Sequence, residues 1–157
     1  MQYSTRPTSH WDLRFLDGTR RVAGWSKDPS TQVGAIIADG AHRIVSVGFN
    51  GFPAGMADTP ARYADRADKY ARIIHAEMNA LLFMRERPTA DMTLYTWPLP
   101  PCDRCAVHLL QAGLRHFVAP ADWNEFGNRT HWQEAIDRAQ SYIEELGGTL
   151  RRVDIEP

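Results

Sequence analysis

Apolar residues recur along the chain at two spacings, one typical of helices and one typical of strands. Residues 11–23 have helical spacing, and Thr8 or Ser9 can cap the helix that this spacing predicts. Two short apolar runs follow, at 33–38 and 44–49, with an Asp-Gly turn signal between them. This arrangement predicts two strands joined as a β-hairpin.

The second half of the chain alternates in the same way. Its predicted elements are a helix from Ile73 that Pro88 ends, a strand at 93–97, a helix at 105–112 with Gly113 as its cap, a strand at 116–119, a long helix opened by a capping box at 130–133, and an edge strand at 150–155. Because helices and strands interleave, we expect an α/β fold, a three-layer α/β/α sandwich with one central mixed sheet of about five strands. The length of 157 residues predicts one domain over residues 1–157.

The overall charge narrows the class of partner. A formal net charge of −1 and a pI near 6.6 provide no broad basic field, so we expect no nucleic-acid partner. The sequence has no apolar run long enough to span a bilayer, and residues 1–7 lack the apolar core of a signal peptide. These features predict a cytoplasmic protein with no membrane association.

Two segments concentrate the residues that bind transition metals. His75-Ala76-Glu77 supplies an imidazole and a carboxylate, and Pro101-Cys102-Asp103-Arg104-Cys105 contains both cysteines of the chain. A catalytic zinc keeps three protein ligands and one open position, so His75, Cys102 and Cys105 are the predicted ligands. Glu77 is the predicted catalytic residue, because a carboxylate beside the metal can take and deliver protons without ligating it.

Other interpretations of these residues stay open at this point. The two cysteines can form a redox-active pair, although the His-x-Glu segment argues against it. A structural zinc site requires a fourth ligand, for which His108 and His116 are candidates, and leaves Glu77 without a purpose.

The loops supply further candidates for ligand binding. Residues 50–55, Asn50 to Gly55, form a shaped loop after a predicted strand, and one or two of the cations within 57–72 are placed to reach a phosphate. Trp123 and Phe126 lie in a polar loop, where an aromatic ring either stacks on a base or packs against the protein.

Several of these segments together resemble the deoxycytidylate (dCMP) deaminases. The segments that carry the resemblance, in the same order along the chain, are 26–35, 48–55, the pair Lys69-Tyr70, 75–80, and 101–106 with 111–113. The zinc motif alone is typical of the wider cytidine deaminase-like superfamily. The first two segments and the Lys-Tyr pair narrow the resemblance to dCMP deaminases, over roughly residues 10 to 120.

The resemblance implies a function, a cofactor and partners. It implies zinc-dependent hydrolysis of dCMP to dUMP and ammonia for dTMP precursor synthesis, with one zinc ion per chain. Asn50 would bind the nucleotide sugar, and the loop at Ser26 and Lys27 would lie near the 5′-phosphate. The family also implies a homo-oligomer, a hexamer or otherwise a dimer or tetramer, activated by dCTP with Mg²⁺ and inhibited by dTTP.

The sequence departs from the family pattern after the strand at 93–97. One residue more than usual separates the strand tyrosine from the first cysteine, so Trp97 and the segment after it are expected to shape the base pocket. A deaminase of a related or 5-substituted cytosine nucleotide is therefore an alternative. Adenosine deamination on tRNA fits the charge poorly, and a catalytically silent zinc-stabilised binding module would not require Glu77.

Overall fold

The computed structural model describes residues 9–122 and 132–155. Its elements in chain order are α1 (His10–Ala23), β1 (Gly34–Ala38), β2 (Ile44–Phe49), α2 (Pro60–Ala64), α3 (Arg66–Arg72), α4 (Ala76–Leu82), β3 (Thr93–Trp97), α5 (Asp103–Ala112), β4 (His116–Pro120), α6 (Gln133–Glu145) and β5 (Thr149–Val153). None of the described helices is long and apolar enough to cross a membrane.

The five strands form one mixed sheet in the order β2-β1-β3-β4-β5. β1 pairs antiparallel with both β2 and β3, and the β1–β2 pair is the predicted hairpin. β3, β4 and β5 are parallel, because α5 and α6 carry the chain back between them. The predicted α/β fold with a central mixed sheet is therefore confirmed.

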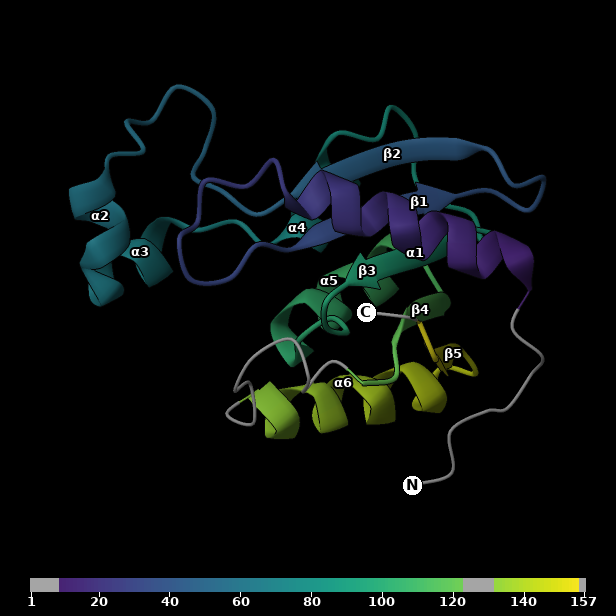
Figure 1. Ribbon diagram of the computed structural model, residues 1–157. Coiled ribbons are helices and arrows are strands. Elements are labelled where there is room, and N and C mark those ends of the chain that lie inside the picture. Colours follow the sequence, from purple (N-terminus) through teal and green to yellow (C-terminus); the bar gives the residue numbers. More distant parts are fainter. Residues whose placement is uncertain (1–8, 123–131, 156–157) are drawn as a thin grey trace.

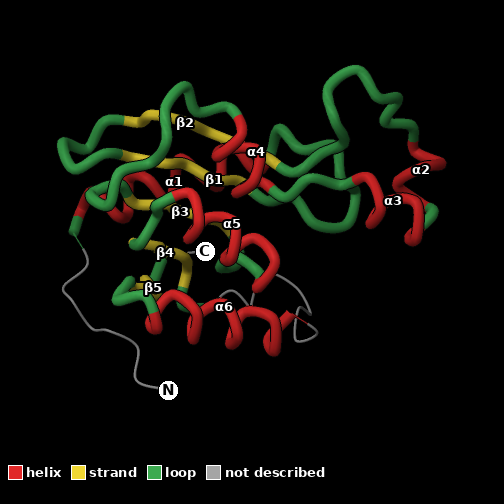
Figure 2. Tube along the Cα trace, turned by 180° about the vertical axis from the view of Figure 1, so that it is seen from behind, coloured by secondary structure: helices red, strands yellow, loops and turns green. Residues whose placement is uncertain are grey.

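Helices cover both faces of the sheet. α1 lies in front of the sheet in Figure 1, where Phe15 and Leu16 pack on Tyr95 and Val118. α4 and α5 lie on the opposite face, toward the viewer in Figure 2, and α6 joins them through Ile143. The three layers agree with the prediction. Burial of these side chains is the main stabilising contribution to the fold.

Local signals explain where most helices begin and end. Ser9 caps α1 by accepting a hydrogen bond from the Asp12 N–H, and Gly113 ends α5 with a φ of 118°. The predicted extension of α4 to Pro88 is wrong, since the helix ends at Leu82, with Phe83 as its C-cap. Leu82 and Phe83 are exposed, so no packing stabilises a further helical turn after them. Pro88 sets only the last position that the helix could reach, and the helix ends before it.

The start of α6 differs from the predicted capping box. The helix begins at Gln133, and Trp132 occupies the N-cap position without a side-chain capping bond. The expected capping residue, Thr130, lies outside the described residues.

Gly48 fixes how closely α4 approaches β2. A Cβ atom at Gly48 would lie 2.4 Å from both the Ala76 carbonyl oxygen and the Ala80 nitrogen. Only glycine permits this contact, and the Ser46 hydroxyl adds a 2.6 Å hydrogen bond to the Ala80 carbonyl. The first turn of α4 therefore has a defined position on the sheet.

Candidate active site

His75 and Glu77 lie at the start of α4. His75 is the N-cap residue, and its side chain makes no capping hydrogen bond. Glu77 is in the first helical turn and is only 3% exposed. The seat of α4 on Gly48 therefore determines the position of the imidazole and of the carboxylate together.

The two cysteines lie at the start of α5. Cys102 is the N-cap residue, and its sulfur accepts a 3.5 Å hydrogen bond from the Cys105 N–H. Between them, Asp103 pairs with Arg138 of α6 at 2.8 Å, which ties the cysteine turn to a second helix. Both sulfurs are buried and face His75.

The three predicted ligands form one cluster. His75 Nδ1 lies 3.6 Å from Cys102 Sγ and 3.2 Å from Cys105 Sγ, and the ligating atoms all lie within 4.8 Å of one another. Zinc bonds of about 2.3 Å to sulfur and about 2.0–2.1 Å to nitrogen, at a tetrahedral angle, separate these atoms by about 3.6 Å. The donor set and its spacing fit zinc.

A fourth protein ligand is not part of this cluster. Among the described residues, no further His, Cys, Asp or Glu joins the three. His108 Nδ1 lies 2.7 Å from the Arg104 carbonyl and His116 Nδ1 lies 2.9 Å from Thr149 Oγ1, so both candidates for a structural site are engaged elsewhere. Three ligands with an open position are typical of a catalytic zinc rather than a structural one.

Zinc binding must displace protons from this cluster, since the hydrogen bond to Cys102 and burial raise the pKa of the Cys105 thiol. A hydrogen bond from Cys105 lowers the pKa of Cys102 to about 4, so its thiolate is present at neutral pH. The hydrogen bond to Cys102 raises the pKa of His75 to about 9. Burial raises the pKa of Glu77 to about 7, which allows this carboxyl group to gain and lose a proton near neutral pH.

A cavity of about 330 Å³ opens above this cluster. His75, Glu77 and Cys102 line the cavity at the predicted metal site, and Leu99 and Trp132 contribute apolar surface. The Trp132 ring meets His75 edge-on, with 6.3 Å between ring centroids. A volume of this size suits a small-molecule ligand.

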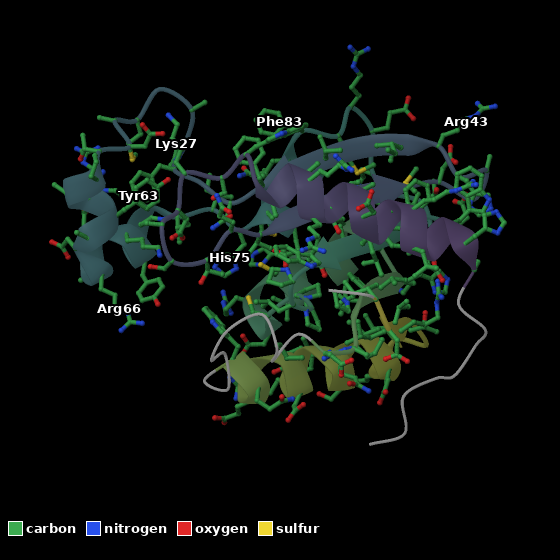
Figure 3. The ribbon with its side chains drawn as sticks, in the orientation of Figure 1. Lys27, Arg43, Tyr63, Arg66, His75 and Phe83 are labelled. Atoms are coloured by element: carbon green, nitrogen blue, oxygen red, sulfur yellow. The ribbon has the colours of Figure 1, made fainter. Side chains whose placement is uncertain are left out.

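Much of the remaining cavity wall comes from the loop before β1 and from α2 and α3. α2 and α3 lie to one side of the sheet (Figure 1), and Figure 3 shows Tyr63 and Arg66 in this region, to the left of His75. The residues that these segments contribute are Asp28, Pro29, Ser30, Thr31, Tyr63, Ala64, Arg66, Lys69 and Tyr70.

A buried polar cluster holds that loop in place. Lys69 Nζ lies 2.9 Å from Asp28 Oδ1, and both side chains are nearly inaccessible to solvent. Asn50 Nδ2 donates to the Thr31 carbonyl at 2.8 Å and to Asp28 Oδ2 at 3.3 Å, while Asn50 Oδ1 accepts from the Val33 N–H at 2.9 Å. Asn50 therefore joins the end of β2 to the loop that precedes β1.

The predicted substrate residues fall into two groups. Asn50 lines the cavity, as expected of a binding residue. Ser26, Lys27 and Trp97, all within the described part of the chain, do not line it. Ser26 Oγ donates to the Asn50 carbonyl at 2.9 Å, and Lys27 pairs with Asp58 at 2.9 Å on the outer surface. Trp123 and Phe126 lie outside the described residues.

Sequence reasoning missed two contributors to the cavity. Lys69 is one of the cations within 57–72 that the sequence offers for a phosphate, but its pairing with Asp28 depends on a contact between residues 41 positions apart. Trp132 follows the apolar spacing of the predicted long helix near the C-terminus, and this spacing predicts packing against the protein. No local signal in the sequence indicates that Lys69 is paired inside the protein or that Trp132 reaches the cavity.

The fold and the cluster together define a class of protein. An α/β protein that brings a His-x-Glu turn and a Pro-Cys-x-x-Cys turn together in a cavity has the arrangement of the zinc-dependent nucleobase deaminases. The known proteins that resemble the chain place it within that class.

Residues 9–121 match the family model described as the cytidine and deoxycytidylate deaminase zinc-binding region. The chain therefore belongs to the cytidine and deoxycytidylate deaminase family, and it is a zinc-dependent hydrolase by that membership. An uncharacterized deaminase of Aliivibrio fischeri is 40% identical over 140 residues, which are 88% of this chain and 90% of the relative.

Two further relatives are informative. The deoxycytidylate deaminase of Homo sapiens is 34% identical over 147 residues, which are 90% of this chain and 79% of that protein. The crystal structure of a dCMP deaminase from the cyanophage S-TIM5, in complex with dCMP and dUMP, superposes with a TM-score of 0.70 over 94% of this chain and 100% of that one. At 19% identity, the second likeness establishes the fold.

Proposed function

We propose that this protein hydrolyses dCMP to dUMP and ammonia, with one zinc ion bound by His75, Cys102 and Cys105. The observation that carries the proposal is the juxtaposition of this three-ligand cluster with the buried Glu77 at the end of a nucleotide-sized cavity. Relatives named deoxycytidylate deaminase, at 32% and 34% identity, support dCMP as the substrate.

The metal and Glu77 divide the chemistry between them. A zinc ion held by three protein ligands supplies a water whose pKa is lowered to about 7. Glu77, whose pKa is raised to about 7 by burial, would accept one proton of that water at its carboxylate and pass it to N3 of the cytosine ring; it would then carry the second proton, from the new hydroxyl on C4, to the amine, which leaves as ammonia. The net reaction consumes one water and releases one ammonia for each dUMP.

The cavity walls orient the nucleotide. Leu99 and Trp132 offer apolar surfaces to the base next to His75. Asn50 borders the sugar region, and its Oδ1, which accepts one bond from Val33, keeps a second lone pair for a sugar hydroxyl. Ser26 does not contact the substrate but holds Asn50 in place through its hydrogen bond to the Asn50 carbonyl. Trp97 likewise affects the base only by positioning the segment that leads to Leu99.

The proposal extends to assembly and regulation. Apolar side chains are exposed along the edge strand β2 and at the end of α4, and they favour a homo-oligomer; these residues are Ile44, Val45, Val47, Phe49, Leu82 and Phe83. Activation by dCTP with Mg²⁺ and inhibition by dTTP are proposed by analogy with the family.

The experiment is a substrate survey with zinc-loaded protein. Ammonia release is measured with dCMP, CMP, deoxycytidine, dCTP and 5-methyl-dCMP, with and without dCTP and Mg²⁺ as effector. The proposal expects the highest kcat/KM with dCMP. If kcat/KM is higher with 5-methyl-dCMP or CMP, that nucleotide is the substrate instead of dCMP. If no cytosine compound releases ammonia, this cavity is not a deaminase active site.

A further inference from the structure

The α3 side of the cavity carries its positive charge. Arg66, Lys69 and Tyr70 line the cavity from one face of this short helix, and His75, Cys102 and Glu77 line the same cavity. A nucleotide bound with its base at the cluster has its phosphate group as the next anion to be neutralised. The cavity therefore contains two candidate cations for one phosphate.

Lys69 and Arg66 differ in whether their charge is already paired within the protein. Lys69 Nζ is 2.9 Å from Asp28 Oδ1 in a buried pair, so its charge is already balanced inside the protein. Arg66 makes no ion pair with any residue in the described ranges 9–122 and 132–155. A cavity-lining arginine without a carboxylate partner is the group whose charge remains for a ligand.

Tyr70 gives Arg66 a defined orientation. Arg66 Nε lies 3.4 Å from the Tyr70 hydroxyl, and the guanidinium carbon is 5.7 Å from the centre of the Tyr70 ring. The contact to Nε leaves the two terminal nitrogens of the guanidinium available, and these nitrogens match the paired oxygens of a phosphate. Arg66 lines the cavity and is exposed, so a dianion reaches it without burial of an isolated charge.

We propose that Arg66, oriented by Tyr70, binds the 5′-phosphate and makes the enzyme prefer a nucleotide over a nucleoside. This inference rests on the proposed deamination of dCMP. Lys69 and Asp28 then hold α3 against the loop at 28–31, so that the Arg66–Tyr70 pair stays at the correct distance from the metal cluster. This proposal places the phosphate contact on α3 rather than at Ser26 and Lys27, since Lys27 pairs with Asp58 and does not line the cavity.

The test measures the preference for the phosphate directly. The kcat/KM for dCMP is divided by the kcat/KM for deoxycytidine in the zinc-loaded wild type, in Arg66→Ala and Arg66→Lys, and in the control Arg62→Ala. Arg62 is a nearby arginine that bonds to the Ala57 carbonyl and does not line the cavity. Zinc content and unfolding midpoint are recorded for each variant.

The proposal predicts that Arg66→Ala lowers this ratio by about 10- to 100-fold, the range expected for losing hydrogen bonds to a charged group. Arg66→Lys retains part of the preference, and Arg62→Ala leaves the ratio unchanged. A ratio within twofold of wild type in zinc-replete Arg66→Ala would overturn the proposal. If the wild type fails to deaminate dCMP at all, the proposed function is at fault instead, so the two failures are distinguishable.

Discussion

Lys69 Nζ and Asp28 Oδ1 lie 2.9 Å apart, although 41 positions separate the two residues in the chain. Asp28 also accepts hydrogen bonds from the Ser30 and Thr31 N–H groups at 2.8 and 3.3 Å. One carboxylate thus connects α3 with the loop that leads into β1. The cavity wall depends on this connection, because both segments line it.

Breaking this buried pair is expected to destabilise the protein. Lys69→Met leaves the Asp28 carboxylate without its cation, at an expected cost of about 3–5 kcal/mol in the free energy of unfolding. Urea unfolding of zinc-loaded protein measures the change. The matched control is Lys27→Met, which removes the exposed partner of Asp58 and is expected to have a much smaller effect. Equal effects of the two substitutions would contradict the structural role of the buried pair.

A methyl group at Gly48 is expected to displace the catalytic turn. In Gly48→Ala the new carbon meets the backbone of α4 at 2.4 Å, so the helix must shift. We expect a loss of about 1–3 kcal/mol of stability together with weaker zinc binding. Gly51→Ala is the control, since nothing lies within 4 Å of a Cβ there. Normal stability and zinc affinity in Gly48→Ala would show that α4 is not seated as described.

Zinc removal is expected to lower both activity and stability. A chelator should abolish ammonia release and lower the unfolding midpoint, and added zinc should restore both. Zinc affinity should fall as the pH is lowered, because protons compete for the thiolates and for His75, whose pKa is raised to about 9 by its hydrogen bond to Cys102. Cys105→Ser should lose zinc, whereas His108→Ala should keep it, since His108 is outside the cluster. Full activity in zinc-free protein would contradict the metal assignment.

Acid sensitivity is expected from a second buried carboxylate. Burial alone would raise the pKa of Asp12, but the hydrogen bond and the charge of Arg151 lower it overall below its usual 3.8. A lowered folded-state pKa stabilises the protein above the unfolded value of 3.8, and this stabilisation is lost as the pH falls through the folded pKa.

The measurement is the unfolding free energy from about pH 5 downward. The slope of stability against pH should be shallower in Asp12→Asn than in wild type. Asp17→Asn, on the exposed side of the same helix, should behave like wild type. Asp12 of α1 pairs with Arg151 of β5. An unchanged slope in Asp12→Asn would show that this ion pair does not make stability depend on pH.

The elements that the sequence predicts well are those with a complete local signal. The strands at 44–49 and 93–97 have the predicted bounds, and Gly113 ends α5 as expected. The signals for these elements are the residue types of each strand, the prolines that follow the second strand and the glycine after the helix, and each can be recognised within a few residues. The metal cluster was predictable for the same reason, since Cys102 and Cys105 are three apart and the histidine has a carboxylate two positions away.

What the sequence did not reveal depends on contacts made across the fold. Adjacent residues in one loop point in opposite directions: Ser26 faces inward to the Asn50 carbonyl, and Lys27 faces outward to Asp58. Their pattern in the sequence does not distinguish these directions, because the loop has no helical or strand period. The pairing of Lys69 with Asp28 likewise exists only when α3 lies against that loop.

The most direct test of the account is the rate of dUMP formation from dCMP by zinc-replete wild type and zinc-replete Glu77→Gln. The account predicts one ammonia for each dUMP in wild type. In the variant it predicts equal zinc content with a rate lower by about 10²–10⁴-fold, because the amide cannot transfer the proton. Turnover of dCMP by zinc-replete Glu77→Gln at close to the wild-type rate would contradict the account.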